Sequence, residues 1–232
     1  MAKYLPERYR LVAVDLPGWG DSSRHDAERY DIRSQAARLE AIVVAIGLTR
    51  FHLAGNSMGG QLAARYALDH PERVASLALI DAAGVASPHP SEVAVARAAG
   101  KNLLIAETPA DYARVWKLFF VKPPQLPGPV LDYLAERAAV HKDFAKKLWS
   151  DLWARPDPLD AELSRVKPPT LVLWGDAARV IDVSSADVFA QGIPGAKLVK
   201  LERCGHVPMA ERPEETAKYY LAFLSGLPGA SR

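Results

Sequence analysis

Short β-branched runs alternate with amphipathic segments along much of the chain. The runs have the length and composition of buried strands. They occupy residues 10–15, 51–56, 76–81, 170–174 and 197–202. Apolar residues at helical spacing predict helices at residues 31–46, 58–69 and 213–224. Strands that alternate with helices predict an α/β protein with a mostly parallel sheet flanked by helices.

The pattern changes between the third and fourth predicted strands. Residues 85–168 show no strand pattern, and repeated prolines divide them into helical segments. One of these begins at Thr108 and Pro109, which suit an N-cap and a first helical residue. We interpret this stretch as a helical cap. The predicted organisation is a core made of residues 1–84 and 169–232, with the cap inserted between its two parts.

Composition narrows the class of protein. The chain has 232 residues and a net charge of +2, with no run of Lys or Arg, which gives no electrostatic reason to expect nucleic acid as a partner. Cys204 is the single cysteine, so the sequence excludes an internal disulfide and a multi-cysteine zinc site. No apolar run approaches the roughly 20 residues of a membrane span, and no signal peptide is visible. The cytoplasm is therefore the default expectation for the compartment.

A candidate nucleophile lies between the strand at 51–56 and the following helix. Residues 55–60 read GNSMGG and match G-x-S-x-G directly after a strand and before a helix, where that motif forms a sharp turn. The turn exposes the hydroxyl of Ser57, and the helix N-terminus favours developing negative charge. The amide of Met58 is the expected oxyanion-hole donor. Small residues at positions 55 and 59 are expected to prevent clashes between the strand and the helix.

Of the six histidines, His206 is the candidate general base. It follows the last predicted strand, in a loop expected above the carboxyl edge of the sheet near Ser57. We interpret the other five as structural or solvated: His25, His52, His70, His89 and His141. Cys204 is interpreted as a small buried thiol, since Ser57 already occupies the nucleophile turn.

Three further motifs carry a resemblance to a known family. They are residues 15–22 (DLPGWGDS), 174–176 (WGD) and 205–213 (GHVPMAERP). With the serine turn they resemble the α/β-hydrolase fold over essentially the whole chain. Within that fold the chain looks closest to monoacylglycerol lipases and related bacterial esterases and lipases.

The resemblance implies a serine carboxylester hydrolase. In this reading Ser57 forms an acyl-enzyme with His206 as base, the substrate is an ester or acylglycerol, and no metal or organic cofactor takes part. Aromatic residues of the cap are candidates for an apolar substrate pocket: Trp116, Phe119, Phe120, Trp149 and Trp153.

The sequence differs from the family pattern in two places. The first concerns the triad acid, which in the family usually stands three residues after the glycine of W-G. Ala178 occupies that place here and cannot accept a hydrogen bond from an imidazole. The possible substitute acids are Asp81, at the end of the third predicted strand, and Asp176, in the same loop as Ala178.

The second departure is at the start of the chain. The family has three strands and an oxyanion loop before the strand that corresponds to residues 10–15, and nothing like them precedes Tyr4. We therefore expect that the sequence is N-terminally truncated, which leaves membrane association open. The missing third strand would lie between residues 10–15 and 51–56, so both would expose unpaired ladder edges.

Two alternatives remain at this point. One is a hydrolase of carbon–carbon bonds in ring-cleavage products, which often have the same GNSMGG turn but tend to carry a tryptophan after the histidine, where this chain has Val207. The other is a catalytically inactive binding protein on a hydrolase fold, which Ala178 and the missing oxyanion loop favour.

Overall fold

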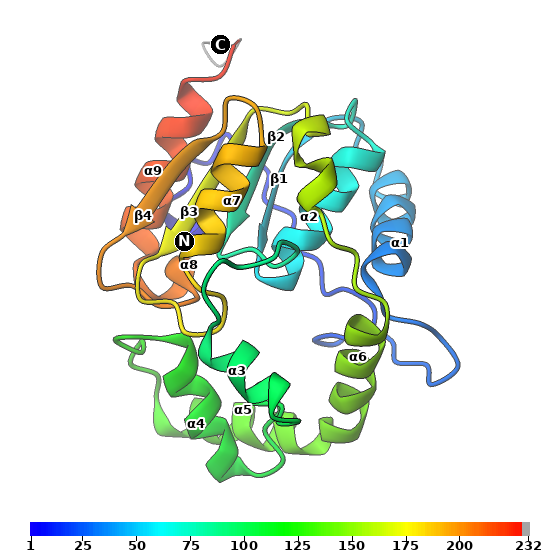
Figure 1. Cartoon of the computed structure of the whole chain (residues 1–232), viewed down its shortest axis with the longest axis vertical. Coiled ribbons are helices and arrows are strands. Elements are labelled where there is room, and N and C mark those ends of the chain that lie inside the picture. The colour runs from blue at the N-terminus through cyan, green and yellow to red at the C-terminus, as the bar shows by residue number, and fades with distance from the viewer. Residues whose placement is uncertain (229–232) are drawn as a thin grey trace.

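The computed structural model describes residues 1–228, and its sheet has four parallel strands (Figure 1). The strands are β1 (Phe51–Asn56), β2 (Val74–Ile80), β3 (Thr170–Gly175) and β4 (Lys197–Leu201). Their order in the sheet is β1-β2-β3-β4, so consecutive strands are neighbours in space. Four of the five predicted strands are confirmed to within two residues. Because the strands are parallel, the loops after them meet at one edge of the sheet.

Helices cover both faces of the sheet. They are α1 (Ile32–Ala45), α2 (Met58–Asp69), α7 (Ser184–Gly192), the short α8 (Pro208–Glu211) and α9 (Pro213–Ser225), with 3-10 turns η1 (Ala2–Tyr4) and η2 (Asp160–Arg165). Leu77 and Leu79 of β2 share an apolar cluster with α1, α2 and α7, whereas Ala78 and Ile80 share one with α9. Successive side chains of a strand point to opposite faces of the sheet, and helices cover both faces here, so a central parallel strand needs apolar residues on both.

Four helices between β2 and β3 lie together beyond one end of the sheet (Figure 1). They are α3 (Glu92–Ala98), α4 (Pro109–Phe119), α5 (Gly128–Val140) and α6 (Lys142–Ala154). The predicted start of α4 is confirmed: Thr108 and Asp111 form a capping box in which each side chain accepts from the backbone of the other. Asp31 likewise caps α1 by accepting from the amide of Ser34.

The predicted strand at residues 10–15 is wrong. The segment forms no ladder, and Leu11, Val12 and Val14 are left exposed, Leu11 to 59%. The physical reason is that a β-branched run forms a strand only against a partner, and β1 is an edge strand among the described residues. The segment instead lines an apolar cavity of about 410 Å³ beside β1 and α1.

No helix within residues 1–228 has both the length and the apolar character needed to cross a membrane.

Candidate active site

Ser57 occupies a strained turn between β1 and α2. Its φ of 56° and ψ of −123° place it in a region that a side-chain-bearing residue rarely adopts. The turn is fixed by backbone bonds: the amide of Ser57 donates to the carbonyl of Ile80 at 3.0 Å, and its own carbonyl accepts from the amides of Gly60 and Ala83, each at 2.9 Å. The strain is thus maintained by the neighbouring strand and helix.

The glycines of this turn differ in what constrains them. A Cβ on Gly55 would collide with the backbone carbonyl of Gly59, and one on Gly60 would lie 2.5 Å from the Cβ of Ala82. A Cβ on Gly59 itself would meet nothing within 4 Å. The expected need for a small residue is confirmed at position 55 but is wrong for position 59. The close packing falls on Gly60 instead.

The loop after β4 brings His206 to the same edge of the sheet as Ser57. The carbonyl of His206 accepts from the side-chain amide of Asn56 at 3.0 Å, next in sequence to Ser57. Its amide donates to the carbonyl of Phe119 at 2.8 Å. The imidazole is 3% exposed, and this burial lowers the pKa of His206 to about 3. A neutral ring with an unshared lone pair is the form that a general base needs.

Of the two possible substitute acids, the structure brings Asp81 to His206. Its Oδ1 lies 4.0 Å from Nδ1 of His206, which has no hydrogen-bond partner among the described residues. Asp81 is completely buried, and burial raises the pKa of its carboxyl well above the usual range. It accepts a bond from the amide of Gly175 at 3.2 Å.

Ala178 and Asp176 lie in the loop after β3. The amide of Ala177 donates to the carbonyl of Cys204 at 3.0 Å, so this loop lies against the one that carries His206. Ala178 is buried in the apolar cluster that contains Trp174. Asp176 is exposed, and none of the interactions in the described part of the chain joins it to His206.

A cavity of about 410 Å³ lies over the serine and histidine. Ser57, Met58 and His206 line it from the core, and α4 to α6 contribute apolar walls. Among the predicted pocket aromatics, Phe119 and Trp149 line this cavity. Trp116, Phe120 and Trp153 do not line it. The rings of Trp116 and Phe120 pack against each other at 4.7 Å, and that of Trp153 packs against Trp149 at 5.6 Å.

Sequence reasoning missed other lining residues of this cavity. Trp19, Tyr112 and His141 contribute to its wall. Trp19 lies inside the DLPGWGDS motif, which was a usable signal, and it packs edge-on against Trp149. His141 joins α5 to α6 and had no distinguishing pattern around it.

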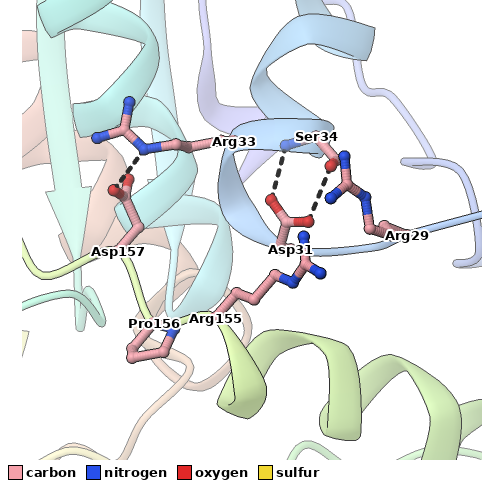
Figure 2. Close-up of a pocket in the computed structure, with 7 residues that line it drawn as sticks. All are labelled: Arg29, Asp31, Arg33, Ser34, Arg155, Pro156 and Asp157. Carbon is pink, nitrogen blue, oxygen red and sulfur yellow. Dashed lines mark hydrogen bonds and ion pairs between the residues drawn. The ribbon is translucent and has the colours of Figure 1, made fainter.

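A second cavity, of about 420 Å³, lies at the start of α1 and contains neither Ser57 nor His206 (Figure 2). Two of its acidic side chains bond to other residues of the lining. Arg33 donates to Asp157 at 2.9 Å, and Asp31 accepts from both the amide and the hydroxyl of Ser34. Since Ser57 and His206 both line the first cavity, the chemistry expected of the chain belongs there.

Within residues 1–228, no three His, Cys, Asp or Glu side chains group as they would around a metal ion.

A strained serine at a strand–helix turn shares a cavity with a buried histidine from the loop after the last strand of a parallel sheet, and this is the arrangement of serine hydrolases with the α/β-hydrolase fold. The family model of the alpha/beta hydrolase fold matches residues 1–213, and the chain belongs to this family.

The likeness extends to curated proteins. Monoacylglycerol lipase abhd6-B of Xenopus laevis is 35% identical over an alignment of 238 positions that covers 98% of this chain and 71% of that protein. Lipase 1 of Psychrobacter immobilis is 33% identical over 94% of this chain and 70% of its own length.

Solved structures agree with the sequence relatives. The crystal structure of a membrane phospholipase A, described as a bacterial virulence factor, is 48% identical with a TM-score of 0.90, and the match covers 91% of this chain and 68% of that one. A putative lipase from Acinetobacter baumannii is 27% identical with a TM-score of 0.85, covering 91% and 73%. These relatives place the chain among the carboxylic ester hydrolases.

The carbon–carbon hydrolase alternative is not favoured. A meta-cleavage product hydrolase, CumD, has a TM-score of 0.77, over 90% of this chain and 78% of that one, but is only 22% identical, so it shows the shared fold and no more.

Proposed function

We propose that Ser57 and His206 hydrolyse an acyl ester through a covalent intermediate. Ser57 attacks the ester carbonyl while Nε2 of His206 takes its proton and then delivers it to the leaving alcohol. Water attacks the acyl-enzyme in the same way, and the carboxylic acid leaves. The observation that carries this proposal is that both residues line one largely apolar cavity, with the serine strained at the N-terminus of α2.

The amide of Met58 is proposed as the oxyanion donor. As the first residue of α2, it has one of the helix amides without an acceptor inside the helix, and it lies directly after the nucleophile. Such a donor acts on the charge that develops on the carbonyl oxygen, and its loss typically reduces turnover by about 10²–10³.

Asp81 is proposed as the acid that serves in place of the residue missing at position 178. A buried Nδ1 without a partner is an unfavourable arrangement, and Asp81 is the carboxyl beside it. A closure of about 1 Å would turn the 4.0 Å separation into a hydrogen bond. An ionised Asp81 would then hold the ring with its proton on Nδ1 and stabilise the imidazolium formed during attack.

The proposed substrates are acylglycerols or related acyl esters. Similarity to monoacylglycerol lipases and lipases supports this class, and the apolar wall formed by Phe119 and Trp149 suits an acyl chain. We also propose that residues 85–168 act as a cap on the core formed by 1–84 and 169–232, since helices from this segment line the cavity that contains Ser57.

A fluorophosphonate probe tests the proposed nucleophile. An activated Oγ displaces fluoride and forms a stable bond to phosphorus, so the probe should label Ser57 and hydrolysis of a medium-chain ester should be lost in Ser57→Ala. Ser150→Ala, an exposed serine of α6, is the matched control and should behave as the parent.

Ala178 supports a second candidate, an inactive binding protein. An inactive binding protein should bind a fatty acid or ester tightly, as measured by calorimetry, while the probe leaves Ser57 unlabelled. That result would contradict the proposed hydrolase activity.

A further inference from the structure

Glu211 holds together two segments that are far apart in the sequence. Its Oε2 accepts from the amide of Gly205 at 2.8 Å and from that of Val121 at 3.3 Å, and its Oε1 accepts from the amide of Lys122 at 2.6 Å. Gly205 directly precedes His206, whereas Val121 and Lys122 directly follow α4 and its C-cap. One carboxylate therefore joins the histidine loop to the end of a helix that lines the substrate cavity.

The backbones of the same two segments are also in direct contact. The amide of His206 donates to the carbonyl of Phe119 at 2.8 Å. A Cβ on Gly205 would lie 2.5 Å from that carbonyl and 2.9 Å from Cα of Phe120, so only glycine allows this approach. The position of the histidine loop is consequently set by the end of α4 as much as by β4.

The carboxylate is the strongest of these connections on chemical grounds. Bonds from backbone amides to an ionised acceptor are shorter and stronger than those to a neutral carbonyl. The amide of Gly205 is buried, so removing its acceptor would leave a polar group unpaired. A glutamine retains one acceptor oxygen, so it can replace the bonds at Oε2 or the bond at Oε1 but not all three, and its NH₂ group would then face a backbone donor.

We propose that Glu211 is a positioning residue that fixes His206 relative to Ser57 and ties this position to the end of α4. Movement of α4 away from the core would thereby move the base. The inference rests on the proposed role of His206. The coupling between the two segments does not depend on that role.

Hydrogen exchange and histidine titration measure this coupling without requiring activity. In Glu211→Gln we expect faster exchange of the amides of Gly205, Val121 and Lys122, and loss of burial should raise the NMR-observed pKa of His206 above its value in the parent. Glu214→Gln removes the same charge from an exposed side chain of the next helix and should change neither measurement.

The possible results separate the claims. If the amide exchange rates and the pKa of His206 in Glu211→Gln equal those of the unmodified protein, Glu211 does not position the base. The same conclusion follows if the amides exchange faster while the pKa of His206 is unchanged. Where the parent labels with fluorophosphonate, Glu211→Gln should label roughly 10- to 100-fold more slowly, because small displacements of a catalytic group have effects of that size. A parent that fails to label contradicts the proposed hydrolase activity, while the exchange and titration results still decide the role of Glu211.

Discussion

At the scale of single residues, burial favours the neutral forms of both His206 and Asp81. It lowers the pKa of the imidazole to about 3 and raises that of the carboxyl well above its usual range. The charge of Glu211 raises the pKa of Asp81 further. A protonated Asp81 cannot stabilise an imidazolium, so turnover should fall as the pH drops through the raised pKa of this carboxyl.

The depressed pKa of His206 predicts a pH dependence of stability. The imidazole of the unfolded chain takes up a proton near pH 6.5, whereas that of the folded chain does so only near pH 3. Protonation of His206 therefore leaves the free energy of unfolding unchanged above pH 6.5 and lowers it as the pH falls from there toward 3. Between pH 7 and pH 5 the parent should lose about 2 kcal/mol from this group, at roughly 1.4 kcal/mol per pH unit.

Urea unfolding of the unmodified protein and of His206→Gln at pH 7 and pH 5 isolates the loss of stability that is due to His206. The variant retains the other ionisable groups, so it should lose less stability on acidification than the parent does. Equal losses in the two proteins would show that His206 does not stay neutral in the folded state.

At the scale of elements, the sequence predicted what depends on neighbouring residues. The N-cap of α4 and the turn at Ser57 use local hydrogen bonds and local geometry, and both were predicted at the correct residues. Segment 10–15 has equally good strand composition but forms no strand, because ladder formation depends on a partner that composition does not specify. Asp81 was among the candidate acids, but its proximity to His206 joins loops after different strands, and the contacts of Glu211 join α8 to residues after α4, so no local pattern could show these contacts.

Two adjacent glycines at the start of α2 provide a matched test of the packing there. Gly60→Ala should destabilise the fold by about 1–3 kcal/mol, because its Cβ would lie 2.5 Å from that of Ala82. Gly59→Ala meets nothing within 4 Å and should stabilise the helix by up to about 1 kcal/mol. Thermal unfolding of the two variants checks this, and equal destabilisation by both would contradict the packing described for the turn.

At the scale of the whole molecule, a buried ion network joins the core to the segment after α6. Arg65 of α2, almost completely buried, donates to Asp157, and also to Glu162 at 2.7 Å. Arg33 of α1 reaches the same Asp157. Removing one partner of a buried ion pair leaves the other charge unpaired, which is strongly destabilising. The network therefore restricts the movement of the end of the helical segment relative to the core.

The proposed triad is also a property of the whole molecule, since its parts follow three different strands. Ser57 follows β1, Asp81 follows β2 and His206 follows β4, while the loop of Ala178 follows β3. A change in the acid can therefore be compensated from a neighbouring loop: an aspartate at position 178 would enter beside the His206 loop, which Ala177 already contacts.

The most direct measurement of the central claim is ester turnover by four proteins: the parent, Asp81→Asn, Ala178→Asp and the double variant. Asparagine tolerates the φ of 42° at position 81, so the fold should be retained. If Asp81 is the acid, Asp81→Asn should reduce kcat by roughly 10³–10⁴, as removal of a triad aspartate does, and Ala178→Asp should restore much of it in the double variant. An Asp81→Asn protein that turns over as fast as the parent would contradict the account.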